Sequence, residues 1–194
     1  MGWIAAAILA ALVVYAVLLY NRLVRSRQLA TEGWSGIDVQ LKRRADLVPN
    51  LVETVRGYAV HERELLARVT ELRNQARAAP AGDVAARGPI EGVLSATLGR
   101  LIAVAENYPD LKANQNFLQL QEQLASVESE IQMARRYYNG TVRDLNVLVE
   151  SFPSNLVASS FGFAKREFFE TEDERDRAVP GVSFGSTPPP RETA

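Results

Sequence analysis

An uncharged apolar run, WIAAAILAALVVYAVLLY at residues 3–20, decides how the rest of the chain is organised. As a helix it would extend about 27 Å at ~1.5 Å per residue, close to the ~30 Å hydrocarbon core of a bilayer. Trp3 and Tyr20 stand at its two ends, where amphipathic rings favour the headgroup level. A buried core helix and a cleaved signal peptide are the alternatives, but a signal peptide needs a basic start and a small-residue cleavage site. Neither feature is present, so we expect a retained transmembrane anchor over residues 3–20.

The charges beside this run predict its orientation. Arg22, Arg25 and Arg27 follow it directly, and no charged side chain precedes it. Positive charges are retained on the cytoplasmic side of a membrane. We therefore expect a single-pass protein of the cell (inner) membrane, with its N-terminus outside and its soluble domain in the cytoplasm. The alternative, an anchor with the domain outside, would normally carry Lys or Arg before the apolar run.

Composition excludes several classes of function. The chain has 194 residues, which suffice for one anchor and one domain of ordinary size. Its formal net charge of -1 provides no overall basic field for a nucleic acid. It has no cysteine and a single histidine, which excludes disulfides, thiol chemistry and clusters of histidine ligands. We expect no cofactor, no metal, no nucleic-acid partner and no small-molecule substrate.

Beyond the anchor, apolar residues recur at alternating spacings of three and four, which is typical of a helix that buries one face in a bundle or coiled coil. The first set is Trp34, Ile37, Leu41, Val48, Leu51, Val55, Tyr58, Leu65, Val69, Leu72 and Ala76. Arg44 and Glu62 occupy the same register. A buried charge is unfavourable unless it is paired, so these two residues are a candidate ion pair in the seam. The alternative is that the register is slightly off and both are exposed.

The basic triplet Lys42-Arg43-Arg44 is a poor candidate for a lipid-binding patch. On a continuous helix Lys42 would lie about 33 Å beyond Tyr20, whereas electrostatic attraction is screened over ~8 Å at physiological salt. Asp38 and Asp46 are each four residues from Lys42. A local ion pair on the helix surface is therefore the expected role.

Pro49 interrupts the first long pattern and leaves two outcomes open. Proline lacks a backbone donor, clashes with the preceding turn and disfavours helical geometry at Val48. The helix can kink and continue, which the unbroken register favours. It can instead end near Leu47 and restart after a tight turn, with Pro49 in the first turn of the next helix.

The remaining patterns predict further helices and no convincing strand. We expect a loop over 79–89, a helix over 90–107, a long helix over 112–152 that continues through Asn139-Gly140, a short helix over 154–160 and an irregular aromatic segment over 161–169. The helical domain should then cover residues 21–169. Residues 170–194 are charged and then proline-rich, so we expect a mostly disordered tail.

One element of the tail is a candidate contact. Pro180, Val182 and Phe184 alternate at period two within an otherwise polar ending. Docked into a groove, the two apolar side chains would contribute roughly 3–5 kcal/mol of burial. Ordering the backbone there, at ~1 kcal/mol per residue, would oppose most of that gain. We expect a weak, reversible contact with the chain's own helices or with a partner.

Several stretches resemble the LemA family. They are IDVQLKRRADLVPNLVETVRGYAVHE at 37–62, ENYPDLKANQNF at 106–117, ARRYYN at 134–139, and FP followed by NLVA within 152–158. The resemblance implies an N-terminally anchored protein of a bacterial membrane, a soluble four-helix bundle, and no established catalytic residue. A four-helix bundle favours the turn at Pro49 over the kink. The family more often has alanine at the position of Gly33, so the helix is expected to be looser there.

The expected fold class is all-α: an N-terminal single transmembrane helix followed by an antiparallel four-helix bundle with long, coiled-coil-like helices. The expected function is a non-catalytic scaffold or adaptor at the lipid bilayer, acting through a protein partner or self-association. The alternative is a hydrolase whose unrecognised site lies among Glu106, Asp110, Lys112 and Ser183. Residues 181–185 match the letters of the G-x-S-x-G nucleophile elbow, but that motif requires a strand-to-helix turn and a histidine downstream. The single histidine, His61, lies upstream.

Overall fold

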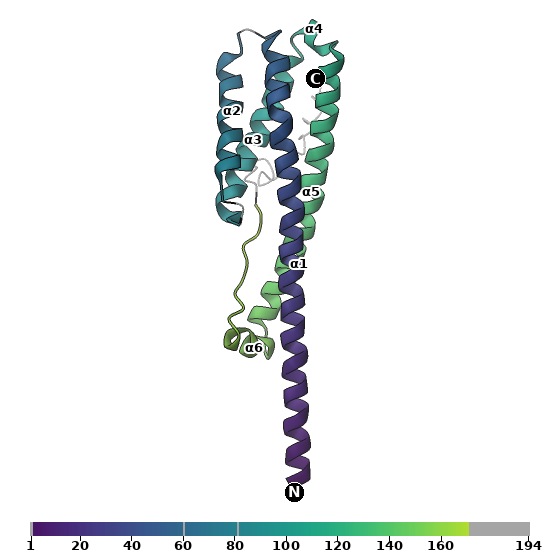
Figure 1. Ribbon diagram of the computed structural model, residues 1–194, viewed down its shortest axis with the longest axis vertical. Coiled ribbons are helices and arrows are strands. Elements are labelled where there is room, and N and C mark those ends of the chain that lie inside the picture. The colour runs from purple at the N-terminus through teal and green to yellow at the C-terminus, as the bar shows by residue number, and fades with distance from the viewer. Residues whose placement is uncertain (1, 60, 81, 171–194) are drawn as a thin grey trace, which may run out of the picture.

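The computed structural model describes residues 2–59, 61–80 and 82–170, and this part of the chain folds into helices (Figure 1). They are α1 Gly2–Arg56, α2 Arg63–Ala78, α3 Val84–Ala105, α4 Pro109–Lys112, α5 Gln115–Glu150 and α6 Ser154–Ser160. None of the described ranges contains a β-strand. The all-α prediction is confirmed for this part of the chain.

α1 continues through Pro49, so the turn that the family resemblance favoured is wrong. Pro49 is exposed, whereas Val48 and Leu51 on either side are buried, so burial continues past the proline. Because Pro49 has no N–H, the carbonyl of Ala45, four residues earlier, loses its helical donor. Arg73 of α2 replaces that donor, since its Nε donates to the Ala45 oxygen at 3.0 Å. The helix therefore accommodates the proline with the freed acceptor satisfied.

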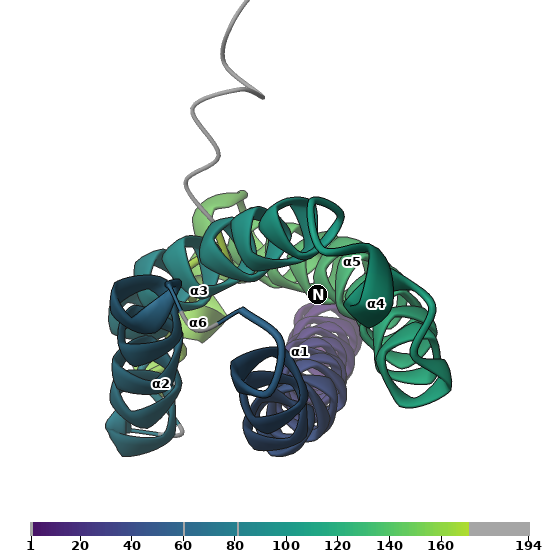
Figure 2. The same cartoon turned by 90° about the horizontal axis from the view of Figure 1, so that it is seen from above.

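The helices pack around α1. It lies alongside α5 and also contacts α2, which packs on α3 (Figures 1 and 2). Buried apolar residues form three clusters. The first joins α1, α2, α3 and the start of α5 and includes Leu51, Val55, Leu66, Val69, Leu98, Leu101 and Phe117. The second lies mainly between α1 and α5 and includes Ile37, Leu41, Ile131, Tyr138 and Phe169. The third, at the end of α5, is Leu23, Leu148, Ala158 and Phe163.

Gly33 allows α1 and α5 to approach closely. A Cβ atom at this position would lie 3.1 Å from the Cα of Tyr138 and 3.3 Å from Cδ1 of Tyr137. The resemblance to the LemA family implied a looser helix at Gly33; α1 is continuous there and the glycine is buried. Its effect is on the distance between the two helices.

The loop predicted over residues 79–89 is only partly present. α3 begins at Val84, and Pro89 lies inside it. Asp83 determines this start, because its Oδ1 accepts the N–H of Ala86 at 2.9 Å. That bond satisfies one of the backbone donors that a first helical turn leaves unpaired. The cap outweighs the proline and glycine content on which the loop prediction depended.

α5 starts later than predicted for the same kind of reason. The side-chain oxygen of Asn114 accepts the backbone N–H groups two and three residues later, at 2.9 and 3.2 Å. Pro109–Lys112 forms the separate short helix α4 before this cap. α5 continues through Gly140 to Glu150, as predicted, and α6 has the bounds of the predicted short helix.

Candidate functional site

The apolar segment of α1 stands apart from the packed helices. Within the described ranges, α1 and α3 are the two helices long and apolar enough to cross a membrane. None of the apolar window in α1 is buried, whereas 39% of the window in α3 is buried. Figure 1 shows α1 extending alone to the N-terminus. α1 is therefore the stronger candidate for a membrane helix, and α3 contributes to the core.

Packing of α1 begins directly after this segment. Leu23 is fully buried and contacts Ala158 of α6 and Phe163. Tyr20 contacts the ring of Phe161 edge-on, with centroids 4.9 Å apart, and the ring of Phe163 at 5.8 Å. The predicted membrane-flanking residue Tyr20 thus also contacts the segment that follows α6.

The other predicted flanking residues are exposed. Trp3 is 92% exposed near the N-terminus. Arg22, Arg25 and Arg27 are exposed just beyond the apolar segment. The guanidinium of Arg27 lies over the ring of Phe163, 4.9 Å from its centroid. These cations lie at the same end of the helical domain as α6.

A chain of six charged side chains with alternating sign lies between α1, α3 and α5. In order it contains Lys42, Asp38, Arg87, Glu91, Arg44 and Glu128. Arg44 is 2% exposed and binds Oε2 of Glu91 at 2.7 Å and Oε2 of Glu128 at 2.8 Å. It also donates to the backbone oxygen of Glu91 at 3.1 Å. Three cations balance three carboxylates, so the network, which we call the charge network, is electrically neutral.

The predicted ion pair between Arg44 and Glu62 is wrong, because Arg44 pairs with other carboxylates. Arg44 is buried and paired, as a charge at a seam position must be, but its carboxylates come from α3 and α5. Glu62 precedes α2, is partly buried, and accepts a long hydrogen bond of 3.4 Å from the hydroxyl of Tyr108. The register of the pattern was right for Arg44, but the pattern carries no information on which helix faces it.

The neighbours of Asp38 in the charge network shift the pKa of its carboxyl. Burial by itself raises the pKa of its carboxyl, but hydrogen bonds and positive charge from Lys42 and Arg87 outweigh burial and hold the pKa below its usual value. The expected local pair between Lys42 and Asp38 is present. Asp38 therefore stays ionised near neutral pH and links the surface lysine to the buried arginine.

A groove of about 530 Å³ opens beside the charge network, between α3 and α5. Small residues of α3 line one side, namely Gly92, Ser95, Ala96, Gly99 and Ala103. Arg44 and Glu91 reach its floor but are paired with each other. Because Glu91 and Glu128 are both held by Arg44, neither is arranged as a general base. The groove is lined by residues of α1, α3 and α5 and by Phe169.

Two asparagines of α5 hold the extended segment that follows α6. Asn146 donates to the backbone oxygen of Arg166 and accepts its N–H, both at 2.9 Å. Asn139 makes the same two bonds with Phe169, at 3.2 and 2.9 Å. Each side-chain amide thus forms the two hydrogen bonds that a neighbouring β-strand would form with this backbone. The segment is bound to α5 without forming regular secondary structure.

Tyr138 adds a third contact. Its hydroxyl donates to the backbone oxygen of Glu167 at 2.9 Å. Burial raises the pKa of this hydroxyl, while Arg166 opposes the rise and Glu167 adds to it, so the donor stays protonated. We call Tyr138, Asn139 and Asn146 the α5 clamp.

The last described residues of the segment bound by the α5 clamp, Phe169 and Glu170, lie against α1 and α3. Phe169 is fully buried and packs on the ring of Trp34 at 5.6 Å. A Cβ atom at Gly88 would clash with the backbone oxygen of Glu170. The absence of a side chain at Gly88 is therefore what lets the segment pass so close to α3.

Of the residues considered for a hydrolase, three lie within the described ranges. Glu106, Asp110 and Lys112 are exposed at the ends of α3 and α4, and none of them takes part in a described ion pair with another. Ser183 and the predicted tail contact at Pro180, Val182 and Phe184 lie outside the described residues.

Sequence reasoning missed the residues that complete the charge network and the α5 clamp. Arg87 and Glu91 are four residues apart, which is a usable signal for an ion pair on one helix face, but the predicted loop hid it. The sequence analysis placed Asn139 within the long helix but predicted no contact for its side chain. For Glu128 and Asn146 no local signal distinguishes them from surface residues.

Together these features define an all-α protein with a candidate membrane helix and a neutralised polar interior. The chain belongs to the LemA family, whose model matches residues 33–184. It is similar to Protein LemA of Metamycoplasma hominis, with 27% identity over 155 residues that cover 79% of this chain and 69% of that protein. It is also similar to Magnetosome protein MamQ 2 of Paramagnetospirillum magneticum, with 23% identity over 189 residues that cover 82% of this chain and 68% of that protein. These names denote no enzyme.

Proposed function

We propose that this protein is a single-pass membrane protein whose helical domain acts as a non-catalytic scaffold or adaptor. The observation that carries the proposal is the continuity of α1, which runs from the unburied apolar segment into the core as one helix. A flexible linker would let the domain move freely above a membrane. A continuous helix instead fixes its distance and tilt, which is what a scaffold needs.

The helical domain is an antiparallel four-helix bundle of α1, α2, α3 and α5. The short connections between α1, α2 and α3 support this, because helices joined by a few residues lie antiparallel. The shared long axis of the four helices supports it as well (Figure 1). The burial of an apolar stripe from each helix is what such a bundle requires.

The domain lies in the cytoplasm and the N-terminus outside. The three exposed arginines after the apolar segment support this orientation, because Lys and Arg are retained on the cytoplasmic side. The partner is a protein, or a second copy of this chain, bound on the exposed helix surfaces.

The test begins with membranes that contain the full chain. After an alkaline wash the protein should remain in the pellet, and added protease should leave the domain intact until the membrane is opened. A Leu9→Arg/Val13→Arg variant, with two charges at roughly +2.5–3.5 kcal/mol each in the middle of the span, should move to the soluble fraction. A wild-type chain found in the soluble fraction would overturn the anchor.

The scaffold role is tested on the same material in mild detergent. Chemical cross-linking followed by purification should yield a defined complex, either with a second copy or with one partner in fixed ratio. A strictly monomeric chain, together with a cellular activity that Asp110→Asn or Lys112→Met abolishes without unfolding the protein, would favour the hydrolase instead.

A further inference from the structure

The end of the helical domain nearest the apolar segment exposes large apolar side chains. Phe152 is 79% exposed, Leu156 is 57% exposed and Phe161 is 64% exposed. They lie before, within and after α6, so one short stretch presents all three. Exposed groups of this size at one place are typical of an interaction surface.

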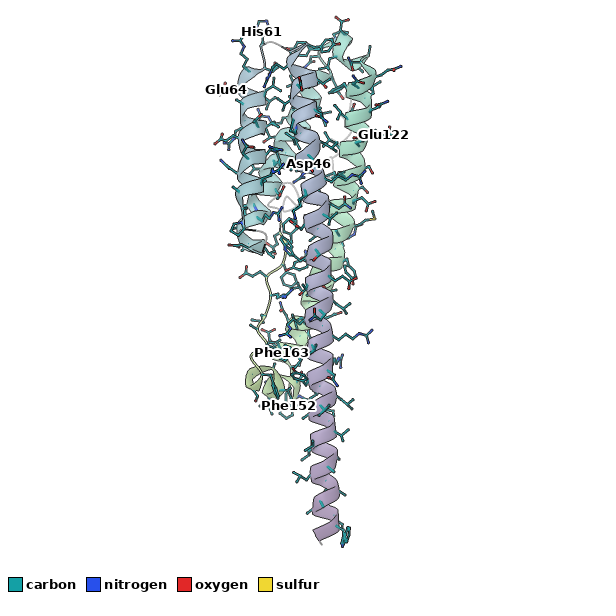
Figure 3. The ribbon with its side chains drawn as sticks, in the orientation of Figure 1. Asp46, His61, Glu64, Glu122, Phe152 and Phe163 are labelled. Atoms are coloured by element: carbon teal, nitrogen blue, oxygen red, sulfur yellow. The ribbon has the colours of Figure 1, made fainter. Side chains whose placement is uncertain are left out.

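The position of α6 is fixed relative to the apolar segment of α1. The contact of Phe161 with Tyr20 places the stretch at the level where the apolar segment ends. Leu23, one turn further along α1, is buried against Ala158 of α6. Figure 3 shows Phe152 and Phe163 beside α1 at the base of the helical domain, below which α1 continues alone. The exposed side chains therefore lie beside the point at which α1 would enter a bilayer.

The chemistry of this stretch fits a lipid interface. Residues 151–164, SFPSNLVASSFGFA, contain no charge. The hydroxyls of Ser154, Ser159 and Ser160 donate to backbone oxygens of the same stretch at 2.8–3.1 Å, so they need no water to satisfy them. The flanking charges, Glu150 and Lys165, pair with each other at 2.7 Å. A neutral surface with these three serine hydroxyls hydrogen-bonded and with exposed aromatic rings suits the boundary between headgroups and acyl chains.

Charge at the same end favours lipid over another apolar protein. Arg22, Arg25 and Arg27 are exposed within about 10 Å of Tyr20 along the helix, at ~1.5 Å per residue. That distance is comparable to the ~8 Å over which charges act at physiological salt. Phosphate groups of a bilayer would lie at the same level as these cations.

We propose that α6, with Phe152 and Phe161 on its flanks, is a second membrane contact that lies in the interfacial layer of the bilayer that α1 spans. The inference rests on the proposed anchor. Its consequence for the anchor is that the domain is attached at two points and cannot rotate freely about the axis of α1. The occupant of the surface is a lipid bilayer, and a second copy or a protein partner is an alternative that the test distinguishes.

The absence of cysteine makes the test direct. Single cysteines replace Leu156, Phe161, Val13 and Val93 in the full chain, a spin label is attached, and the protein is reconstituted in phosphatidylethanolamine–phosphatidylglycerol vesicles. Val13 reports the centre of the span. Val93 is the matched control, because it is an apolar residue of α3 that is 47% exposed and far from this end. Collision of each label with oxygen, which concentrates in lipid, and with a water-soluble nickel complex is measured.

We expect the labels at positions 156 and 161 to show a several-fold lower ratio of nickel to oxygen collisions than the label at 93, and the label at 13 to show a lower ratio still. Equal ratios at 156, 161 and 93, with position 13 shielded from nickel, would overturn the second contact and leave the anchor standing. Exposure of position 13 to nickel would overturn the anchor. Labels at 156 and 161 that are shielded from both reagents would indicate a protein contact and overturn the lipid assignment.

A second variant separates a lipid contact from a local effect of the label. In a Phe161→Ser background, which leaves the buried residues of α6 in place, the label at 156 should become several-fold more accessible to nickel. A label at 156 that is unchanged by Phe161→Ser, and as accessible as the one at 93, would count against the proposal.

Discussion

Arg73 donates its Nε–H to the backbone oxygen of Ala45 at 3.0 Å, and this oxygen is the acceptor that Pro49 leaves without a partner. The donor comes from α2, 28 residues along the chain. A proline inside a long helix is thereby tolerated through a contact between two helices. The same contact joins α2 to the middle of α1, so the proline and the arginine act together.

Replacing Arg73 with methionine should lower the free energy of unfolding by roughly 1.5–3 kcal/mol, the range for a hydrogen bond from a charged donor. In a Pro49→Ala background residue 49 again has an N–H that can bond to Ala45, so the loss from Arg73→Met should fall below about 1 kcal/mol. Urea unfolding of the full chain in detergent, followed by far-UV circular dichroism, measures both. Arg68→Met is the control, because Arg68 is exposed on the same helix and forms an exposed ion pair with Glu71. Equal losses in the two backgrounds would contradict the role assigned to Arg73.

The charge network should be sensitive to the loss of one partner. Glu91→Gln leaves Arg44 and Arg87 buried without their shared carboxylate, and we expect a loss of about 3–5 kcal/mol. Replacing Arg44 with Met and Glu91 with Leu together should cost less than Glu91→Gln alone, because Arg87 keeps Asp38 as its partner and Glu128, which loses Arg44, has a side chain that is 37% exposed to water. Glu71→Gln, at an exposed pair, should change stability by less than about 1 kcal/mol. The same unfolding measurement compares the variants.

The pKa of Asp38 predicts how stability changes in acid. Because its pKa is lower in the folded chain than the usual value of 3.8, its contribution is complete above that value and is lost as the pH falls through the folded pKa. Melting temperatures measured from about pH 6 down to about pH 2 should therefore fall more steeply for the wild-type chain than for Asp38→Asn. The variant should be less stable at neutral pH, since Lys42 and Arg87 lose their carboxylate. Parallel curves for the two proteins would contradict this assignment.

Gly88 should control the docking of the segment after α6. Gly88→Ala places a methyl group against the backbone oxygen of Glu170 and should displace the end of the segment from α3. Trypsin should then cut after Lys165 and Arg166 faster than in the wild-type chain. Gly99→Ala is the matched control in the same helix, because a Cβ atom there meets nothing within 4 Å. That variant should be unchanged in proteolysis and up to ~1 kcal/mol more stable, since alanine favours a helix over glycine.

Features with a local signal could be predicted from the sequence. The apolar segment, the helical stripes, the passage of α5 through Gly140 and the pair between Lys42 and Asp38 all depend on residues within a few turns of one another. The helix starts at Asp83 and Asn114 were missed although both residues are good caps. The prolines and glycines near these residues favoured loops, and the helix-capping side chains outweigh that preference in the structure.

Features that depend on distant residues could not be predicted. Whether α1 passes Pro49 depends on Arg73, and the partners of Arg44 lie 47 and 84 residues away. The positions of these partners follow from how the helices pack, which a pattern along one helix does not specify. The resemblance to the LemA family implied a four-helix bundle, and it favoured the wrong outcome at Pro49.

The α5 clamp affects the stability of α5 at Gly140, where glycine disfavours a helix. Asn139 and Asn146 are seven residues apart, about 10.5 Å on a helix at ~1.5 Å per residue. Arg166 and Phe169 are three residues apart, about 10 Å in an extended chain at ~3.3 Å per residue. The two lengths match only while α5 stays helical, and Gly140 lies between the two asparagines. The bound segment therefore stabilises the helical conformation of α5 at that glycine. A ligand that displaced the segment would also destabilise α5 there.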